Sequence, residues 1–260
     1  MAWIWSERHI EEHGMRGYTV FAGIVPPSLL TDLRRVCRRA RELARERSGP
    51  QAQRLQPVFE HDLDHQPFTD FAELPELVDA VHRTLSPQHT YGLRDGLGVL
   101  LEPADEPWCT HWHRDWRDNV LDLDRERWEA DYRDPALFNQ LNCALYEDSS
   151  TWVVPGSHLR PDLPGEEARF PDRPVPRPEL DGLTSEERER ACLEYCLSLP
   201  GARQLHLGAG DFCLYRNTLW HIGSYVPYRT RATLHDHVDT PAYRAWRESE
   251  RAAARRRRES

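Results

Sequence analysis

The sequence predicts a mainly-β fold, a double-sheet jelly roll with flanking α-helices. Short apolar segments with an alternating pattern recur between turn-forming residues from about residue 91 to 240. Helical periodicity is instead concentrated in residues 1–90 and 241–260. No internal repeat or long Gly/Ser linker divides the 260 residues. We therefore expect one domain, 1–260, with N-terminal helices and a strand, a jelly-roll core, and a C-terminal helix and tail.

Composition excludes several classes of protein. Hydrophobic residues make up 39% and charged residues 30%, which suits a real core beneath a charged surface. The net charge of -9 argues against a general nucleic-acid binder, because phosphate contacts need a basic footprint. No apolar run approaches the length of a membrane span, and the N-terminus lacks the pattern of a signal peptide. We expect a cytoplasmic protein with a small-molecule substrate. No sequence feature points to a particular oligomeric state.

The spacing of the six cysteines and the choice of basic residues are also informative. The cysteines show no CxxC spacing, so free thiols are favoured over disulfides. All 34 basic residues are arginine, which suggests coding bias more readily than function. The run Arg255–Arg258 is expected to be a solvated, frayed terminus.

Helices are expected mainly outside the core. Ser6–His13 and Pro75–Leu85 have helical spacing, and Pro26 and Pro27 open a longer helix with one leucine-rich face. Thr184–Glu187 has the pattern of a capping box for a helix through about Leu197.

The core segments are predicted to be strands, and turn residues suggest how they pair. Their ranges are 97–101, 141–146, 152–154, 204–207, 212–215 and 232–238. We expect two hairpins, one joining 141–146 to 152–154 and one joining 204–207 to 212–215 around Gly208–Asp211.

The stretch Cys109–Trp116 contains the most informative pattern. In a β-strand residues i and i+2 share a face, so His113 and Asp115 can present an imidazole and a carboxylate together. His221, at the end of a second apolar strand, can supply a third ligand. Two histidines and one carboxylate form the facial triad of non-haem iron oxygenases. His111 shares the parity of His113, so a cupin-like His-x-His pair remains an alternative.

Several segments in this order resemble the phytanoyl-CoA dioxygenase (PhyH-like) family of Fe(II)/2-oxoglutarate-dependent oxygenases. They are Gly17–Phe21, His113–Asp115, Trp152–His158, Gly208–Phe212, His221 and Arg231–His235. The resemblance spans about residues 14–237. It implies a double-stranded β-helix, and it implies Fe(II), 2-oxoglutarate and O2 as cofactor and cosubstrates. The implied reaction is oxidation, in the simplest case hydroxylation, of an unactivated C–H bond with release of succinate and CO2.

The resemblance also assigns roles to particular residues. It implies His113, Asp115 and His221 as iron ligands and Arg231 as the anchor for the far carboxylate of 2-oxoglutarate, with Ser224 adding a hydroxyl. Arginine suits a carboxylate through its fixed fork of donors. Arg229 has the same strand parity as Arg231 and competes with it. Further candidates for substrate contacts are His111, Trp116, Asn142 and His235. The Pro-rich segment 161–178 is expected to cover the substrate.

Two other classes of function stay open at this stage. One is a cupin-type isomerase or dioxygenase that uses the metal without 2-oxoglutarate, and the other is a non-catalytic binding protein on the same scaffold. The sequence does not name the substrate. Glu102, Asp105, Glu106 and Asp118 near the expected mouth would suit an amine, but a solvated surface explains them more simply.

Overall fold

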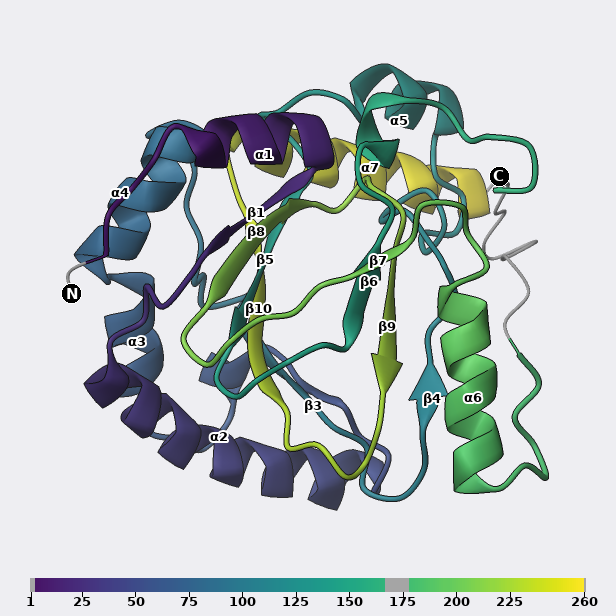
Figure 1. Cartoon of the computed structure of the whole chain (residues 1–260). Coiled ribbons are helices and arrows are strands. Elements are labelled where there is room, and N and C mark those ends of the chain that lie inside the picture. Colours follow the sequence, from purple (N-terminus) through teal and green to yellow (C-terminus); the bar gives the residue numbers. More distant parts are fainter. Residues whose placement is uncertain (1–2, 167–177, 260) are drawn as a thin grey trace.

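A computed structural model describes residues 3–166 and 178–259 of the chain (Figure 1). Its helices are α1 (Arg8–Arg16), α2 (Pro27–Ser48), α3 (Gln66–Ala72), α4 (Pro75–Thr84), α5 (Arg125–Asp131), α6 (Ser185–Cys196) and α7 (Pro241–Glu259). Its strands are β1 (Tyr18–Phe21), β2 (Arg54–Leu55), β3 (Gly98–Leu101), β4 (Trp108–Cys109), β5 (Asn139–Ala144), β6 (Thr151–Val153), β7 (Arg203–Gln204), β8 (Phe212–Arg216), β9 (His221–Tyr225) and β10 (Ala232–Val238).

Two antiparallel sheets form the jelly roll. The larger sheet has the order β1-β8-β5-β10-β3-β2, and the smaller has the order β4-β9-β6-β7. Strand β10 is central in the larger sheet, where Leu234 pairs with Cys143 of β5 on one side and Val99 of β3 on the other. This double-sheet arrangement confirms the predicted jelly roll.

Successive side chains of β10 point alternately to the hydrophobic core outside the larger sheet and to the cavity between the two sheets. Leu234 and Val238 are buried in the large apolar cluster that contains side chains of α2, α3 and α4. His235 and His237 point to the other face of the sheet and line a cavity between the sheets. The strand therefore contributes to the hydrophobic core with one face and to the candidate site with the other.

The helices cover the sheets from outside. In Figure 1, α2, α3 and α4 lie along the larger sheet and α6 lies beside β4 and β9. The capping box predicted for α6 is present, with Thr184 and Glu187 bonding reciprocally. Cys192, Tyr195 and Cys196 of α6 pack on Trp152 and Ile222 of the smaller sheet. Helices α5 and α7 pack together at one end of the roll through aromatic side chains.

Three expectations need correction. The described residues are about 37% helical and 18% extended, so the fold is not plainly mainly β. Neither predicted hairpin forms: β6 pairs with β7 and β9 rather than β5, and β7 and β8 belong to different sheets. The turns at 147–150 and 208–211 instead carry the chain from one sheet to the other, as Asp148 pairing with Leu207 shows.

All six cysteines lie in the described parts of the chain, where they are buried and form no disulfide, as expected. No helix within the described parts of the chain is long and apolar enough to span a membrane.

Candidate metal centre

Two chain segments meet at the interior of the roll and bring the predicted ligands together. His113 and His221 form an antiparallel bridge in which each backbone N–H donates to the carbonyl of the other, at 3.1 and 3.0 Å. The Asp115 N–H then donates to the Asn217 carbonyl at 2.9 Å. His113 and Asp115 thus keep the expected strand spacing, although regular strand β4 ends at Cys109.

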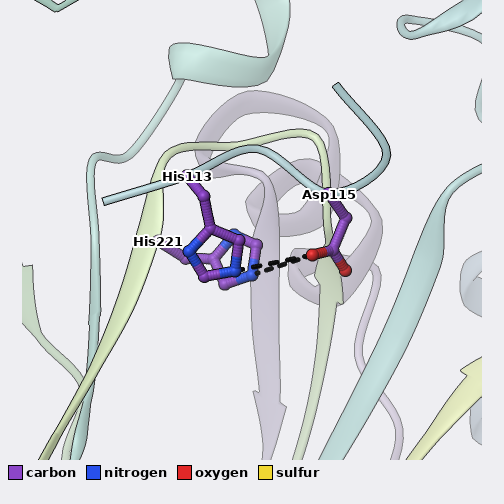
Figure 2. Close-up of side chains that lie close together, drawn as sticks. All are labelled: His113, Asp115 and His221. Atoms are coloured by element: carbon purple, nitrogen blue, oxygen red, sulfur yellow. Dashed lines mark ion pairs between the residues drawn. The ribbon is translucent and has the colours of Figure 1, made fainter. Parts of the chain in front are cut away.

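The three side chains converge on one point (Figure 2). Oδ1 of Asp115 lies 3.5 Å from Nε2 of His113 and 3.7 Å from Nε2 of His221. One ligand atom from each residue lies within 4.8 Å of the others. Nitrogen and carboxylate ligands of this kind suit a divalent transition metal such as Fe(II). The donor set therefore fits the predicted iron.

Hydrogen bonds on the far side of each imidazole fix its orientation. Nδ1 of His113 lies 2.8 Å from the His111 carbonyl, and Nδ1 of His221 lies 3.0 Å from the Leu219 carbonyl. A carbonyl can only accept, so each Nδ1 carries the proton and each Nε2 presents a lone pair to the centre. This is the tautomer that a metal ligand requires.

The carboxylate is held by three side-chain amides. Asn119 donates to Oδ1 at 2.9 Å, while Gln140 and Asn217 donate to Oδ2 at 2.5 and 3.2 Å. Gln140 in turn accepts from the Tyr215 hydroxyl at 2.7 Å. Oδ2 is thereby occupied by protein donors, and Oδ1 remains directed at the two imidazoles.

Electrostatics keep the carboxylate of Asp115 charged. Burial alone would raise its pKa, but the imidazoles of His113 and His221 lower that pKa well below its usual range. Burial lowers the pKa of His221 to about 4, so this ring is neutral at pH 7. Burial also acts to lower the pKa of His113, but the Asp115 carboxylate outweighs it and raises that pKa. Without a metal, His113 therefore takes up a second proton, on Nε2 facing Asp115, more readily than a free imidazole does. Metal binding would displace that proton.

Arg114 lies between His113 and Asp115 in the chain, but its side chain points away from the triad. It connects this segment to two others by hydrogen bonds. It is 1% exposed, and its guanidinium donates to the carbonyls of Ser157 and Thr218 at 2.8 and 2.9 Å. An ion pair of 3.0 Å joins it to Asp162. Ser157 also accepts from the backbone N–H of Trp220 at 2.8 Å. The segment after β6 thus braces the loop that carries His221, which explains why the 152–158 motif accompanies the ligands.

The triad opens into a cavity of about 290 Å³ between the sheets. Its polar lining includes Gln140, Asn142, Tyr215, Tyr225, His235 and His237. Arg231 is 6% exposed and also lines it. The Nε of Arg231 donates to Asp148 at 2.9 Å, so this guanidinium already has one carboxylate partner.

The arginine that competes with Arg231, and the serine expected to assist it, both lie outside the lining of the metal cavity. Arg229 is exposed, donates to Ser149, and lines a neighbouring pocket rather than the metal cavity. Ser224 also lines that neighbouring pocket, and it interacts with Cys196 of α6. Ser224 alternates with His221 and Gly223 along β9, which places it on the outer face of the sheet. The geometry therefore favours Arg231 and does not favour Ser224.

The predicted substrate contacts divide into two groups. Asn142 and His235 line the metal cavity, where His235 Nδ1 lies 2.9 Å from the Asn142 amide oxygen. Trp116 instead donates to the Tyr243 hydroxyl and packs on Trp246 of α7. His111 is outside both the ligand cluster and the cavity lining, which does not support the His-x-His alternative. Most of the segment 161–178, namely 167–177, lies outside the described residues.

Sequence reasoning missed the residues that support the carboxylate and one at the mouth of the cavity. Gln140 was an available signal, because it alternates with apolar Leu141 and Cys143 along strand 139–144 and so belongs to the face that lines the cavity. Asn217 belongs to the segment before His221 and carried no signal of its own. Arg54, on the edge strand β2, comes from a stretch without periodicity.

The fold matches solved structures, whereas no protein-family model and no curated protein matches the sequence. HygX from Streptomyces hygroscopicus, with nickel and 2-oxoglutarate bound, has a TM-score of 0.63 at 16% identity, over 91% of this chain and 88% of that one. EctD from S. alaskensis, with 2-oxoglutarate and 5-hydroxyectoine, has a TM-score of 0.55 at 17% identity, over 93% and 78%. The non-heme alpha ketoglutarate dependent carbocyclase SnoK from nogalamycin biosynthesis has a TM-score of 0.54 at 16% identity, over 90% and 84%. The chain thus shares its fold with proteins that bind or depend on 2-oxoglutarate, and the resemblance is confirmed at the level of the fold.

Proposed function

We propose that the protein is a non-haem Fe(II)- and 2-oxoglutarate-dependent oxygenase of the phytanoyl-CoA dioxygenase type that hydroxylates a C–H bond of a small molecule. One observation carries this proposal: His113, Asp115 and His221 converge, with both Nε2 atoms and Oδ1 of the carboxylate directed at one point. The similarity in fold to HygX and EctD, both solved with 2-oxoglutarate, supports it.

In the proposed reaction, the substrate C–H bond, O2 and 2-oxoglutarate give an alcohol, succinate and CO2. Bound iron would supply the site at which O2 is activated. The chain's own residues do the rest: the triad holds the metal, Arg231 holds the far carboxylate of 2-oxoglutarate, and the buried cavity limits access of water. An intact Asp115 leaves no space for a halide at that position, so a non-halogenating oxidation is favoured.

The test is anaerobic addition of Fe(II) and 2-oxoglutarate to the metal-free protein. We expect a visible metal-to-ligand charge-transfer band that is lost in folded Asp115→Ala and His221→Ala variants. A band that survives both substitutions would refute the ligand assignment. Metal binding without a 2-oxoglutarate band would favour a cupin-type enzyme, and no metal binding would favour a binding protein.

The reaction itself is tested by succinate formation in air against a panel of candidate metabolites. A coupled substrate should give one oxidised product per succinate. The carbocyclase SnoK is a reminder that the same fold is compatible with outcomes other than hydroxylation, so the product must be identified by mass.

A further inference from the structure

A second arginine besides Arg231, namely Arg54, lies on the inner face of the larger sheet and lines the metal cavity. Arg54 of β2 lies opposite Leu100 of β3, which lies opposite Thr233 of β10. Directly paired residues of antiparallel strands share a face, so Arg54 lies on the same face as Thr233 and His235. Arg54 and Gln56 both line the cavity that contains His113 and Asp115.

Packing holds this edge of the sheet in place. A Cβ at Gly98 would lie 2.6 Å from Cβ of Gln56, so glycine leaves the space in which this side chain rests on β3. The Gln56 amide also donates to the Gly96 carbonyl. The segment that carries Arg54 is therefore fixed against β3, while the Arg54 side chain itself is exposed at the mouth of the cavity.

The charges around the cavity leave Arg54 without a partner. Among the described lining residues, Asp115 is the carboxylate and Arg54 and Arg231 are the arginines. The Arg231 side chain is paired with Asp148, whereas the Arg54 side chain makes no hydrogen bond or ion pair within the described parts of the chain. Burial lowers the pKa values of His235 and His237, and the charge of Arg54 adds to this effect, so both rings are neutral near pH 7.

Three of the four acidic residues that could have favoured an amine are paired with arginines outside the metal cavity. Glu102 pairs with Arg41 at 2.8 Å, Glu106 with Arg188 at 3.0 Å, and Asp118 with Arg117 at 2.6 Å. Glu102, Glu106 and Asp118 are also outside the lining of the metal cavity. A cationic substrate would thus meet an unpaired arginine and no free carboxylate.

We infer that the primary substrate is a small molecule with an anionic group, a carboxylate or a phosphate, and that Arg54 binds this group at the mouth of the cavity. The inference rests on the proposed oxygenase function. Strands lie about 4.8 Å apart, so β2 is about 10 Å from β10, which carries Arg231 near its start. Two anions can then be held separately, 2-oxoglutarate by Arg231 and the substrate by Arg54.

The size of the cavity adds to this inference. Its volume of about 290 Å³ is at the lower end of the roughly 300–1,000 Å³ of small-molecule sites. Because 2-oxoglutarate must fill part of that volume, only a small part of the substrate enters beside the metal. An anchor at the mouth then fixes which carbon reaches the iron.

The experiment uses the full chain loaded anaerobically with Fe(II) and 2-oxoglutarate. The probes are matched pairs: carboxylic acids with their primary amides, and phosphate monoesters with their parent alcohols. Binding is followed by the change in the charge-transfer band, and succinate formation in air serves as a second readout. We expect acids of one class to bind more tightly than their neutral partners. Arg54→Gln should weaken these acids by about 10- to 100-fold and leave the neutral partners unchanged.

Two controls separate the possible outcomes. Arg38→Gln, at an exposed position on α2, should keep the preference for acids, and Arg54→Lys should keep part of it. The inference is overturned if no acid binds more tightly than its neutral partner, or if the preference survives Arg54→Gln. It is also overturned if Arg54→Gln weakens 2-oxoglutarate to the same extent, which would make Arg54 a cosubstrate ligand. A missing band in the unmodified protein would instead be a failure of the proposed function.

Discussion

Arg231 is buried beside the metal cavity, yet it does not need a ligand to balance its charge. Burial would lower its pKa, but the carboxylate of Asp148 outweighs that effect and raises the pKa. A buried guanidinium needs an anion beside it, and Asp148 already provides one before any cosubstrate binds. Asp148 holds Nε, and the side chain still borders the cavity, so the terminal nitrogens are the donors to test.

We predict that Arg231→Ala weakens 2-oxoglutarate binding by about 100- to 1,000-fold, because a charge-assisted, bidentate contact is lost. The affinity is measured by titrating 2-oxoglutarate into the Fe(II)-loaded protein and following the charge-transfer band. The variant should also be less stable, since Asp148 is left buried without its cation. Arg231→Lys should recover part of the affinity. Arg229→Ala is the matched control, and a larger effect there than at Arg231 would contradict the assignment.

Gln140 gives a second prediction at the level of single residues. It links the Tyr215 hydroxyl to Oδ2 of Asp115, so it directs Oδ1 toward the imidazoles. We expect Gln140→Leu to weaken Fe(II) by about 10- to 100-fold, the usual effect of losing a partner that orients a metal ligand. Competition with a chelator measures the affinity. Tyr215→Phe, which keeps the amide, should have a smaller effect; equal iron affinity in all three proteins would exclude this role.

At the level of chain segments, Arg114 joins three of them: the one that carries His113 and Asp115, the one after β6, and the one before His221. We predict that Arg114→Lys lowers both thermal stability and Fe(II) affinity, the latter by at least about tenfold, because an ammonium cannot reproduce the planar fork. Arg133→Lys is the control, because Arg133 is exposed and lies near Arg114. This variant should change neither quantity. Loss of stability with unchanged iron affinity would restrict Arg114 to a structural role.

The sequence predicted individual elements better than their pairing. Strand Ala232–Val238 and the capping box of α6 appear as expected, because both depend on local pattern. The hairpins were wrong because alternating polarity shows that a segment is a strand and not which sheet it joins. Turn 147–150 crosses between sheets, where Asp148 bonds to Arg231 and Thr233, far away in the sequence.

In the candidate site too, local patterns could be predicted from the sequence, whereas contacts that depend on strand pairing could not. His113, Asp115 and His221 were predictable from spacing and resemblance, and the structure brings them together. Gln140 and Arg54 come from other strands, and only the register of the larger sheet places them at the cavity. Ser224 lies three residues after His221, so their side chains point to opposite faces if both belong to one strand. The sequence showed this spacing but not that a regular strand begins at His221 and includes Ser224.

At the level of the whole molecule, two buried histidines, His13 and His158, lie where segments that are distant in the sequence pack together. His158 donates from Nε2 to the Gly14 carbonyl at 3.1 Å, which joins the 152–158 motif to α1. A Cβ at Gly17, whose φ is 85°, would lie 2.6 Å from His158 Nδ1, so glycine is required there for both conformation and space. His13 of α1 is 6% exposed. Both rings are buried near Arg216, which opposes their protonation.

These two histidines predict how stability changes with pH. Burial, with Arg216, lowers the pKa of His13 to about 3 and that of His158 to about 4. In the unfolded chain both have a pKa of about 6.5, so the unfolded state binds more protons as the pH falls below that value. Stability is therefore full above about pH 6.5 and falls as the pH decreases toward 4. Each ring contributes about 1.4 kcal/mol per pH unit in this window.

We expect urea unfolding of the metal-free protein, measured between pH 7.5 and 5, to show a steep loss of stability as the pH falls. The double variant His13→Gln, His158→Gln should be less stable at pH 7.5 because its packing is disturbed, but its slope should be shallower by up to about 2.7 kcal/mol per pH unit. A chelator keeps the metal ligands from adding to the difference. Parallel curves for the two proteins would mean that His13 and His158 are protonated in the folded state as readily as in the unfolded chain.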